Sequence, residues 1–258
     1  MNLISFNEKK LPMKDLETIG MASGGQLLLN VGDLKALLSG RRTGLLELQN
    51  LEAENIKIQS LNAKVSLVTG KDGKVDLLIH PVYRKPSTPD FLDDHEAQQL
   101  EKGEVANLLK ITIDDKGNKT EKLVEFDPDT REFIISDTEK ILAPDMVNNE
   151  FLTLAQKEKY RRGKEVELAD RTEFSYSAID PQGMRANRLA LIASVLIDGG
   201  LSYMLYQGLN ALFNKTRDSK EAGFESPGYK NAMIDMEDQY RRVPEQQKRA
   251  YSRSGGTR

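Results

Sequence analysis

The sequence contains no cysteine, no tryptophan and only two histidines, His80 and His95. The absence of cysteine excludes disulfide bonds, thiolate chemistry and every cysteine-ligated zinc site. Two histidines are too few for a histidine-based metal centre unless carboxylates complete it. The net charge of −3 argues against a protein whose overall charge draws it to nucleic acid.

Motifs for phosphate binding and catalysis are missing as well. The sequence has no Gly-x-Gly-x-x-Gly and no Gly-x4-Gly-Lys-Ser/Thr. Aspartates gather at residues 90–94 and 114–115, where a helix N-terminus and a solvated turn explain them better than a metal does. We therefore expect no catalytic residue, no metal and no cofactor, and we interpret the protein as not an enzyme.

A long apolar stretch, residues 189–213, contains no lysine, arginine or glutamate. It is long enough for a membrane span, which takes roughly 20 apolar residues. An aspartate near its centre, Asp198, opposes a span because it costs about 2.5 to 3.5 kcal/mol there. Together with Gly199 and Gly200 it is typical of a turn between two short helices. The residues fit both interpretations, an apolar helical hairpin or a single membrane span.

The N-terminal part combines two short helices with alternating strands. Apolar spacing predicts helices over residues 11–20 and 30–40. Apolar and polar residues then alternate over residues 45–80, and the Lys-Asp-Gly-Lys sequence at 71–74 is typical of a hairpin turn. The pattern predicts an antiparallel meander with one buried face.

Two later segments resemble each other. Each opens with a Phe-Leu pair, at Phe91 and at Phe151, continues as a charged helix and reaches a glycine where the helix ends. Strand patterns follow in both. We interpret residues 87–148 and 149–184 as two helix-hairpin repeats, with Phe91 and Phe151 buried equivalently.

These patterns predict an α+β fold. Its expected parts are an N-terminal helix-and-meander domain, the two repeats, the apolar segment and a charged, largely disordered basic tail. Their boundaries are residues 1–86, 87–148, 149–184, 185–213 and 214–258.

Three groups of basic residues are candidates for contact with nucleic acid or another anion. The first lies in the loop before the meander, and the second lies at a helix C-terminus, where the helix dipole alone favours basic residues. The third belongs to the tail, which cannot bury enough apolar surface to fold alone. The candidates are Arg41, Arg42, Arg161, Arg162, Lys164, Arg241, Arg242, Lys248 and Arg249.

Several segments resemble uncharacterised families. They include LPMKDLETIG, LKALLSGRRT, LIHPVYRKP, DFLDDHEAQQLEKGE and EFLTLAQKEKYRRGKEVELAD, together with the apolar stretch. Over residues 11–213 the chain is similar to two neighbouring families, the domains of unknown function three-nine-four-five and four-zero-nine-nine. Both are common on conjugative transposons and other mobile elements of Bacteroidota. The resemblance implies this genomic context and no catalytic residue.

We therefore expect a non-catalytic accessory or interaction protein of a mobile genetic element. It would bind protein or nucleic acid during DNA transfer or host takeover. The alternative is a membrane-associated anchor or adaptor with a cytoplasmic folded part. The N-terminus lacks the apolar core of a secretory signal, so we expect a cytoplasmic location, at the inner membrane in the second case, and no small-molecule substrate.

Overall fold

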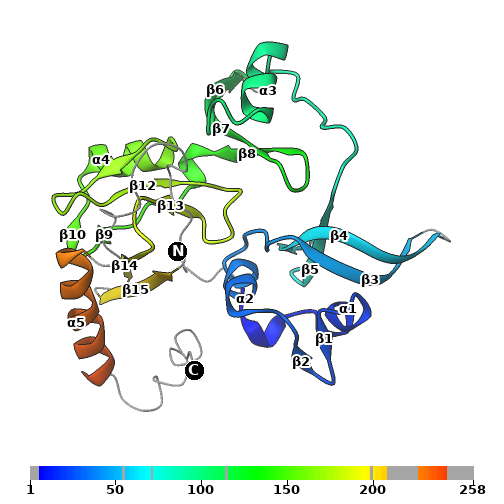
Figure 1. The fold of residues 1–258 in the computed structure, drawn as a ribbon, viewed down its shortest axis with the longest axis horizontal. Helices are drawn as coiled ribbons and strands as arrows, with labels where there is room; N and C mark the ends of the chain where they lie inside the picture. The colour runs from blue at the N-terminus through cyan, green and yellow to red at the C-terminus, as the bar shows by residue number, and fades with distance from the viewer. Residues whose placement is uncertain are drawn as a thin grey trace. The chain divides into compact units, whose positions relative to one another are not determined.

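The computed structural model describes residues 6–53, 56–70, 72–113, 116–197, 200–207 and 226–242 (Figure 1). The chain divides into two compact units. The first comprises Met1–Ser136 and Ala178–Gly183, and the second comprises Asp137–Ser177 and Met184–Arg258. Each unit is therefore built from two separate stretches of chain.

The first unit begins with short helices and a three-stranded meander. Its elements are η1 (Glu8–Lys10), α1 (Met13–Thr18), β1 (Ala22–Ser23), β2 (Gln26–Leu27), α2 (Val31–Leu38), β3 (Leu46–Ala53), β4 (Ile56–Thr69) and β5 (Val75–Pro81). β3, β4 and β5 pair antiparallel in that order, with Leu46 opposite Ala63 and Val65 opposite Ile79. The antiparallel meander expected from the alternation is thus present.

Apolar residues of both kinds of element form one core beneath this meander. Leu16 of α1, Leu37 of α2, and Leu48 and Val65 of the sheet are each at most 1% exposed. The short helices have too few residues to be stable alone, so packing against the sheet stabilises them.

Besides the two-stranded sheet β1-β2, another three-stranded sheet completes the first unit. Its elements are α3 (Asp94–Glu101), β6 (Leu108–Ile113), β7 (Lys119–Asp127) and β8 (Glu132–Asp137), and the strand order is β6-β7-β8. Leu92, Leu100 and Val124 form the core between helix and sheet. The segment Ala178–Gly183 returns to this unit, where the Ala178 N–H donates to Glu125 Oε2 at 2.6 Å.

The described residues of the second unit form two more antiparallel sheets. Its elements are η2 (Thr138–Lys140), β9 (Met146–Val147), β10 (Glu150–Phe151), α4 (Leu154–Arg161), β11 (Val166–Glu167), β12 (Glu173–Tyr176), β13 (Met184–Ala186), β14 (Ala190–Ile197), β15 (Gly200–Gln207) and α5 (Pro227–Arg242). One sheet has the order β10-β9-β14-β15 and the other β11-β12-β13.

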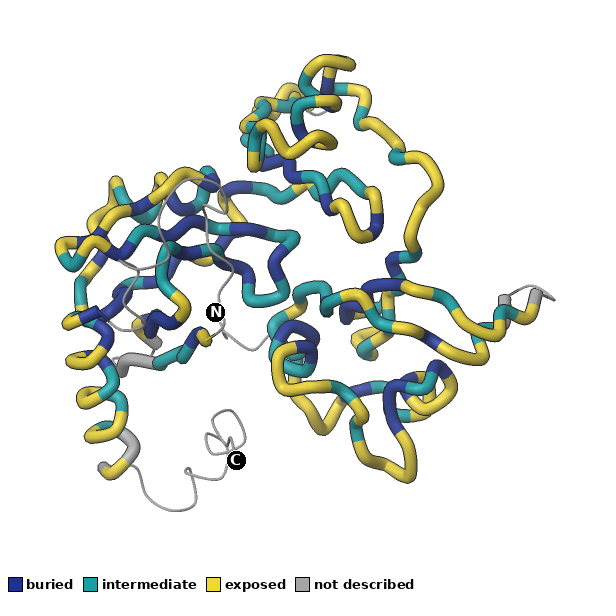
Figure 2. The backbone as a smooth tube through the Cα atoms, viewed as in Figure 1, coloured by how far each residue is buried: buried dark blue, intermediate teal, exposed yellow. Residues whose placement is uncertain are grey.

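Within the apolar stretch, Ala190–Ile197 and Gly200–Gln207 fold as strands, so the predicted helical hairpin or membrane span is wrong. β14 and β15 pair over their whole length, from Ala190 opposite Gln207 to Ile197 opposite Gly200. Alternate residues of β14 face opposite sides of the sheet, yet both sets are buried from Ala190 to Val195 (Figure 2). A strand buried on both faces is continuously apolar, and this produced the membrane-like pattern.

Part of that stretch lies outside the described residues, namely Asp198, Gly199 and residues 208–213. Gly200 is the first residue of β15. Among the described helices, none is both long enough and apolar enough to cross a membrane.

The helix α5 covers one face of β14 and is held by a buried polar cluster at its N-terminus. Tyr229 and Ala232 of α5 pack on Ala190 and Ile192. The Asn148 side-chain amide donates to Thr172 Oγ1 at 3.1 Å and to Ser226 Oγ at 3.2 Å, and its Oδ1 accepts the Ile192 N–H at 3.1 Å. Ser226 in turn accepts the Tyr229 N–H, a helix cap.

The prediction of helix-hairpin repeats is also wrong. Both helices do begin with a capping box, at Asp93 and at Thr153, but three strands follow each of them instead of a hairpin. Phe91 packs partly buried against the core of its sheet, whereas Phe151 is 61% exposed. The fold is thus mostly antiparallel β-sheet with few helices, and the expected α+β class is corrected accordingly.

Candidate functional site

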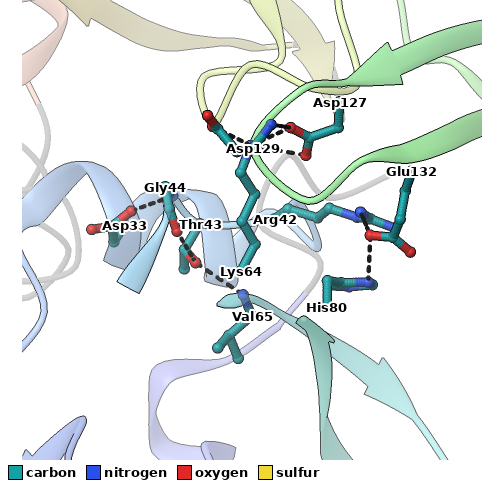
Figure 3. Close-up of polar contacts among 10 residues, drawn as sticks. All are labelled: Asp33, Arg42, Thr43, Gly44, Lys64, Val65, His80, Asp127, Asp129 and Glu132. Carbon is teal, nitrogen blue, oxygen red and sulfur yellow. Dashed lines mark hydrogen bonds and ion pairs between the residues drawn. The ribbon is translucent and has the colours of Figure 1, made fainter. Parts of the chain in front are cut away.

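A buried polar cluster joins the meander to the β7–β8 turn within the first unit (Figure 3). Lys64 of β4 lies at its centre, with Nζ 2.9 Å from each oxygen of Asp127 and 3.0 Å from Asp129 Oδ2. The Lys64 and Asp127 side chains are 3% and 1% exposed, and Asp129 is half exposed. Lys64 Nζ donates a hydrogen bond to Asp127 Oδ1, and its interaction with Asp127 Oδ2 is that of an ion pair. The cluster is therefore an ion pair withdrawn from water.

A second set of contacts lies beside this pair. Arg42 Nη1 is 2.6 Å from Glu132 Oε2, and His80 Nδ1 is 3.9 Å from the same oxygen. His80 Nε2 is 2.9 Å from Ser66 Oγ. Burial, followed by the charge of Arg42, lowers the pKa of His80 to about 4, and the nearby carboxylates of Glu132 and Asp127 only partly oppose this. The imidazole is neutral at pH 7.

The order Ser66, His80, Glu132 resembles a catalytic triad, but its geometry is that of a structural contact. The His80–Glu132 separation of 3.9 Å is longer than a hydrogen bond. The same carboxylate oxygen accepts from Arg42. Ser66 lies in the middle of β4 and is 8% exposed, so a substrate cannot reach its hydroxyl. These residues position β4 and β5 against Glu132.

The loop between α2 and β3 places Arg42 in this cluster. Asp33 Oδ1 accepts the Gly44 N–H at 2.7 Å, and Thr43 Oγ1 accepts the Val65 N–H at 3.0 Å. The Thr43 N–H donates to the Val65 carbonyl at 2.9 Å. Thr43 is fully buried, and both its N–H and its hydroxyl form hydrogen bonds with the Val65 backbone. These contacts fix the backbone of the loop and so determine where the preceding residue, Arg42, is placed.

The two arginines predicted to contact nucleic acid, Arg41 and Arg42, make contacts within the first unit. Arg41 Nε donates to the Pro181 carbonyl at 2.9 Å, and Arg42 pairs with Glu132. Gly183 lies so close to Arg41 that a Cβ there would be 2.9 Å from Arg41 Cδ. Both guanidinium groups therefore serve the fold.

The other predicted basic residues belong to the second unit. Arg161 is the last residue of α4, Arg162 is its C-cap, and Lys164 follows and is exposed. Arg241 is exposed on α5, Arg242 ends that helix, and Lys248 and Arg249 lie outside the described residues.

One surface feature was not anticipated from the sequence. The apolar edge, which we define as Leu109, Ile111 and Ile113 of β6, is 36%, 67% and 63% exposed. In the described part of the chain β6 pairs with β7 alone, so its other backbone edge has no strand beside it. The sequence did contain a pattern for this strand, namely the alternation of apolar and polar residues over 108–113. That pattern predicts a strand, but it does not show which of its side chains remain exposed.

Residues 6–90 match a family model described as a protein of unknown function (DUF4099). The match covers α1 to β5 and confirms one of the two expected families for this segment. No curated protein and no solved structure matches the chain.

Proposed function

We propose that the protein is a non-catalytic interaction protein that binds a protein partner by accepting an added strand at β6. The observation that carries this proposal is the apolar edge on a strand whose outer backbone is unpaired in the described chain. The partner contributes an extended segment that continues the β6-β7-β8 sheet.

Edge strands expose backbone N–H and C=O groups that can pair with another chain. Proteins commonly blunt such an edge with lysine, proline or a bulge facing outward. β6 has none of these on its exposed positions, since Leu109, Ile111 and Ile113 are all aliphatic. Strand addition uses this combination, because main-chain hydrogen bonds supply affinity and alternate side chains supply specificity.

The edge is also rigidly supported. Lys110, between the exposed residues, faces α3, and its Nζ lies 2.7 Å from Glu96 Oε1. Leu108 contributes to the core with Leu92 and Leu100. A rigid strand loses little conformational entropy when a partner binds.

The resemblance of residues 11–213 to families that are common on mobile elements supports a role of the protein in such an element. We propose that the partner is another protein of the same element and that the contact serves DNA transfer or host takeover. Nucleic acid is less favoured as the partner of the first unit, because Arg41 and Arg42 are engaged in internal contacts.

The test uses the proteins encoded by the two neighbouring genes, each titrated against the full chain by calorimetry. Ile111→Lys places a charge in the middle of the edge and is expected to weaken binding at least tenfold. Ile234→Lys is the matched control, because Ile234 is 59% exposed on the helix α5, whose backbone is not a strand edge. Equal binding by both variants, or no binding by either neighbour, overturns strand addition at β6.

A further inference from the structure

The helix α4 and the turn after it carry a concentration of basic residues. Residues 154–164 contain five basic side chains and one acid, Glu158. Lys157 is neutralised by its ion pair with Asp145. Of the other four, Arg161 and Arg162 lie 3.8 Å and 3.3 Å from Glu158, and Lys159 and Lys164 are exposed. A net positive charge therefore remains on the solvent side of this helix.

Acidic residues near α4 lower the positive charge of this surface but do not neutralise it. Glu139 lines a shallow hollow together with Thr138, Glu158 and Arg161, which lowers the charge at that side. Glu165 and Glu167 follow the turn at Gly163, where φ is +64° and the chain leaves the helix. Lys159 lies on the helix and Arg162 is its C-cap, and neither of them lines the hollow that contains Glu139.

Two apolar side chains project into solvent where the same helix begins. Phe151 is 61% exposed and Leu154 is 86% exposed, the highest value among the large apolar residues described. Between them, Leu152 is 7% exposed and anchors the chain in the core. The Thr153 capping box, with Gln156, fixes the start of the helix. The two apolar groups are thus presented by a rigid backbone.

The opposite side of α4 is committed to the core. Tyr160 is 4% exposed and its ring lies 5.8 Å from those of Phe174 and Tyr176. Leu154, Glu158 and Arg162 recur at every fourth position and so share the outward side. A flat surface that meets this side contacts the apolar start and the basic end of the helix together.

We infer that α4, with Phe151 and Leu154, docks the second unit on an anionic lipid bilayer. The positive charge complements lipid phosphates, and the two apolar groups enter the boundary between headgroups and acyl chains. A nucleic-acid backbone would match the charge but offers nothing to the apolar pair. With only two inserted side chains the contact is peripheral and reversible. It does not depend on strand addition at β6.

The test exploits the absence of tryptophan from the chain. Phe151→Trp introduces a single tryptophan at the expected insertion point. Because Phe151 is exposed, the larger side chain does not disturb the core. The matched control is Ile234→Trp, because Ile234 is 59% exposed on α5. Each full-length variant is mixed with vesicles of phosphatidylcholine alone or with an equal part of phosphatidylglycerol. We expect a blue shift of emission only for Phe151→Trp, only with the anionic vesicles, and reversed by high salt.

Charge reversal provides a second measurement. In the Phe151→Trp background, Lys159→Glu combined with Arg162→Glu should lower the partition coefficient at least 25-fold, since each basic residue near an anionic surface contributes about fivefold. Lys102→Glu is the control, because Lys102 is the C-cap of α3 as Arg162 is of α4. No blue shift, an equal shift at both tryptophan positions, or insensitivity to the charge reversals overturns the proposal. A shift with duplex DNA but not with vesicles overturns it in favour of nucleic acid.

Discussion

Lys64 and Asp127 form an ion pair that is almost completely withdrawn from water, with side chains 3% and 1% exposed and Nζ 2.9 Å from Oδ2. The two residues are far apart in the sequence, one on β4 of the meander and one at the end of β7. Taking two charges out of water costs several kcal/mol, so such a pair contributes little net stability while it remains intact. We expect its main effect to be on the specificity with which these strands pack, because either charge buried without the other is costly.

Removal of one partner should be strongly destabilising. In Lys64→Met the Asp127 carboxylate remains buried without its counter-charge, and the free energy of unfolding should fall by about 3 to 5 kcal/mol. Urea denaturation of the full chain measures this. The matched control is Lys74→Met, because Lys74 and Asp72 are also 2.9 Å apart but 80% and 55% exposed. That change should cost less than about 1 kcal/mol. Similar losses for both variants would contradict the role of burial.

The pH dependence of stability should carry a contribution from His80. Its pKa is lowered from 6.5 to about 4 on folding, so between these values the unfolded chain binds the proton and the folded chain does not. Stability from this group is therefore fully present above pH 6.5 and decreases as the pH falls toward 4, by roughly 3 kcal/mol in total.

Comparison with His80→Gln isolates this contribution, because other titrating groups remain in both proteins. The difference in unfolding free energy between wild type and variant should shrink when the pH falls from 7 to 4.5. His95→Gln serves as the control, since His95 is the other histidine and is exposed on α3. A constant difference for His80→Gln across this range would show that its pKa is not lowered.

Glycine at position 228 should be required for docking of α5. Within a helix, Gly→Ala ordinarily stabilises by about 1 kcal/mol. At Gly228 a Cβ would lie 2.5 Å from the Asn148 carbonyl oxygen and 2.7 Å from Asp170 Oδ2. Gly228→Ala should therefore destabilise the protein and speed hydrogen exchange in α5. Asn231→Ala, at an exposed position of the same helix, should do the opposite. Slower exchange in Gly228→Ala would contradict this close packing.

Local patterns predicted local structure well. Alternation in residues 45–80 predicted the meander, and the charged segments after the Phe-Leu pairs predicted helices where α3 and α4 lie. These features depend on neighbours in the sequence, so the sequence alone contains the information.

The errors arose where distant residues decide the outcome. The run at 190–197 is apolar at every position except Ser194, which fits a buried helix, a membrane span or a strand covered on both faces. Only the packing of Tyr229 and Ala232 on one face distinguishes these possibilities, and α5 lies many residues later. Similarly, a Phe-Leu pair opens α3 and α4 alike, but nothing nearby in the sequence shows that Phe151 lacks the cover that Phe91 has.

The candidate site was missed for the same reason. Lys64, Asp127 and Glu132 are ordinary charged residues in strand patterns, and no spacing links them. Arg42 was singled out for its charge, whereas its role depends on Glu132, which is brought near by the fold.

The discontinuous first unit has a consequence for synthesis of the chain. Glu125 accepts a hydrogen bond from the Ala178 N–H, and Arg41 donates one to the Pro181 carbonyl. Both backbone groups belong to Ala178–Gly183, a segment that is translated after β9 to β12 of the other unit. The first unit cannot finish folding on the ribosome until residue 183 has emerged. A nascent chain stalled before that point would hold an incomplete first unit while strands of the second unit are already exposed to chaperones.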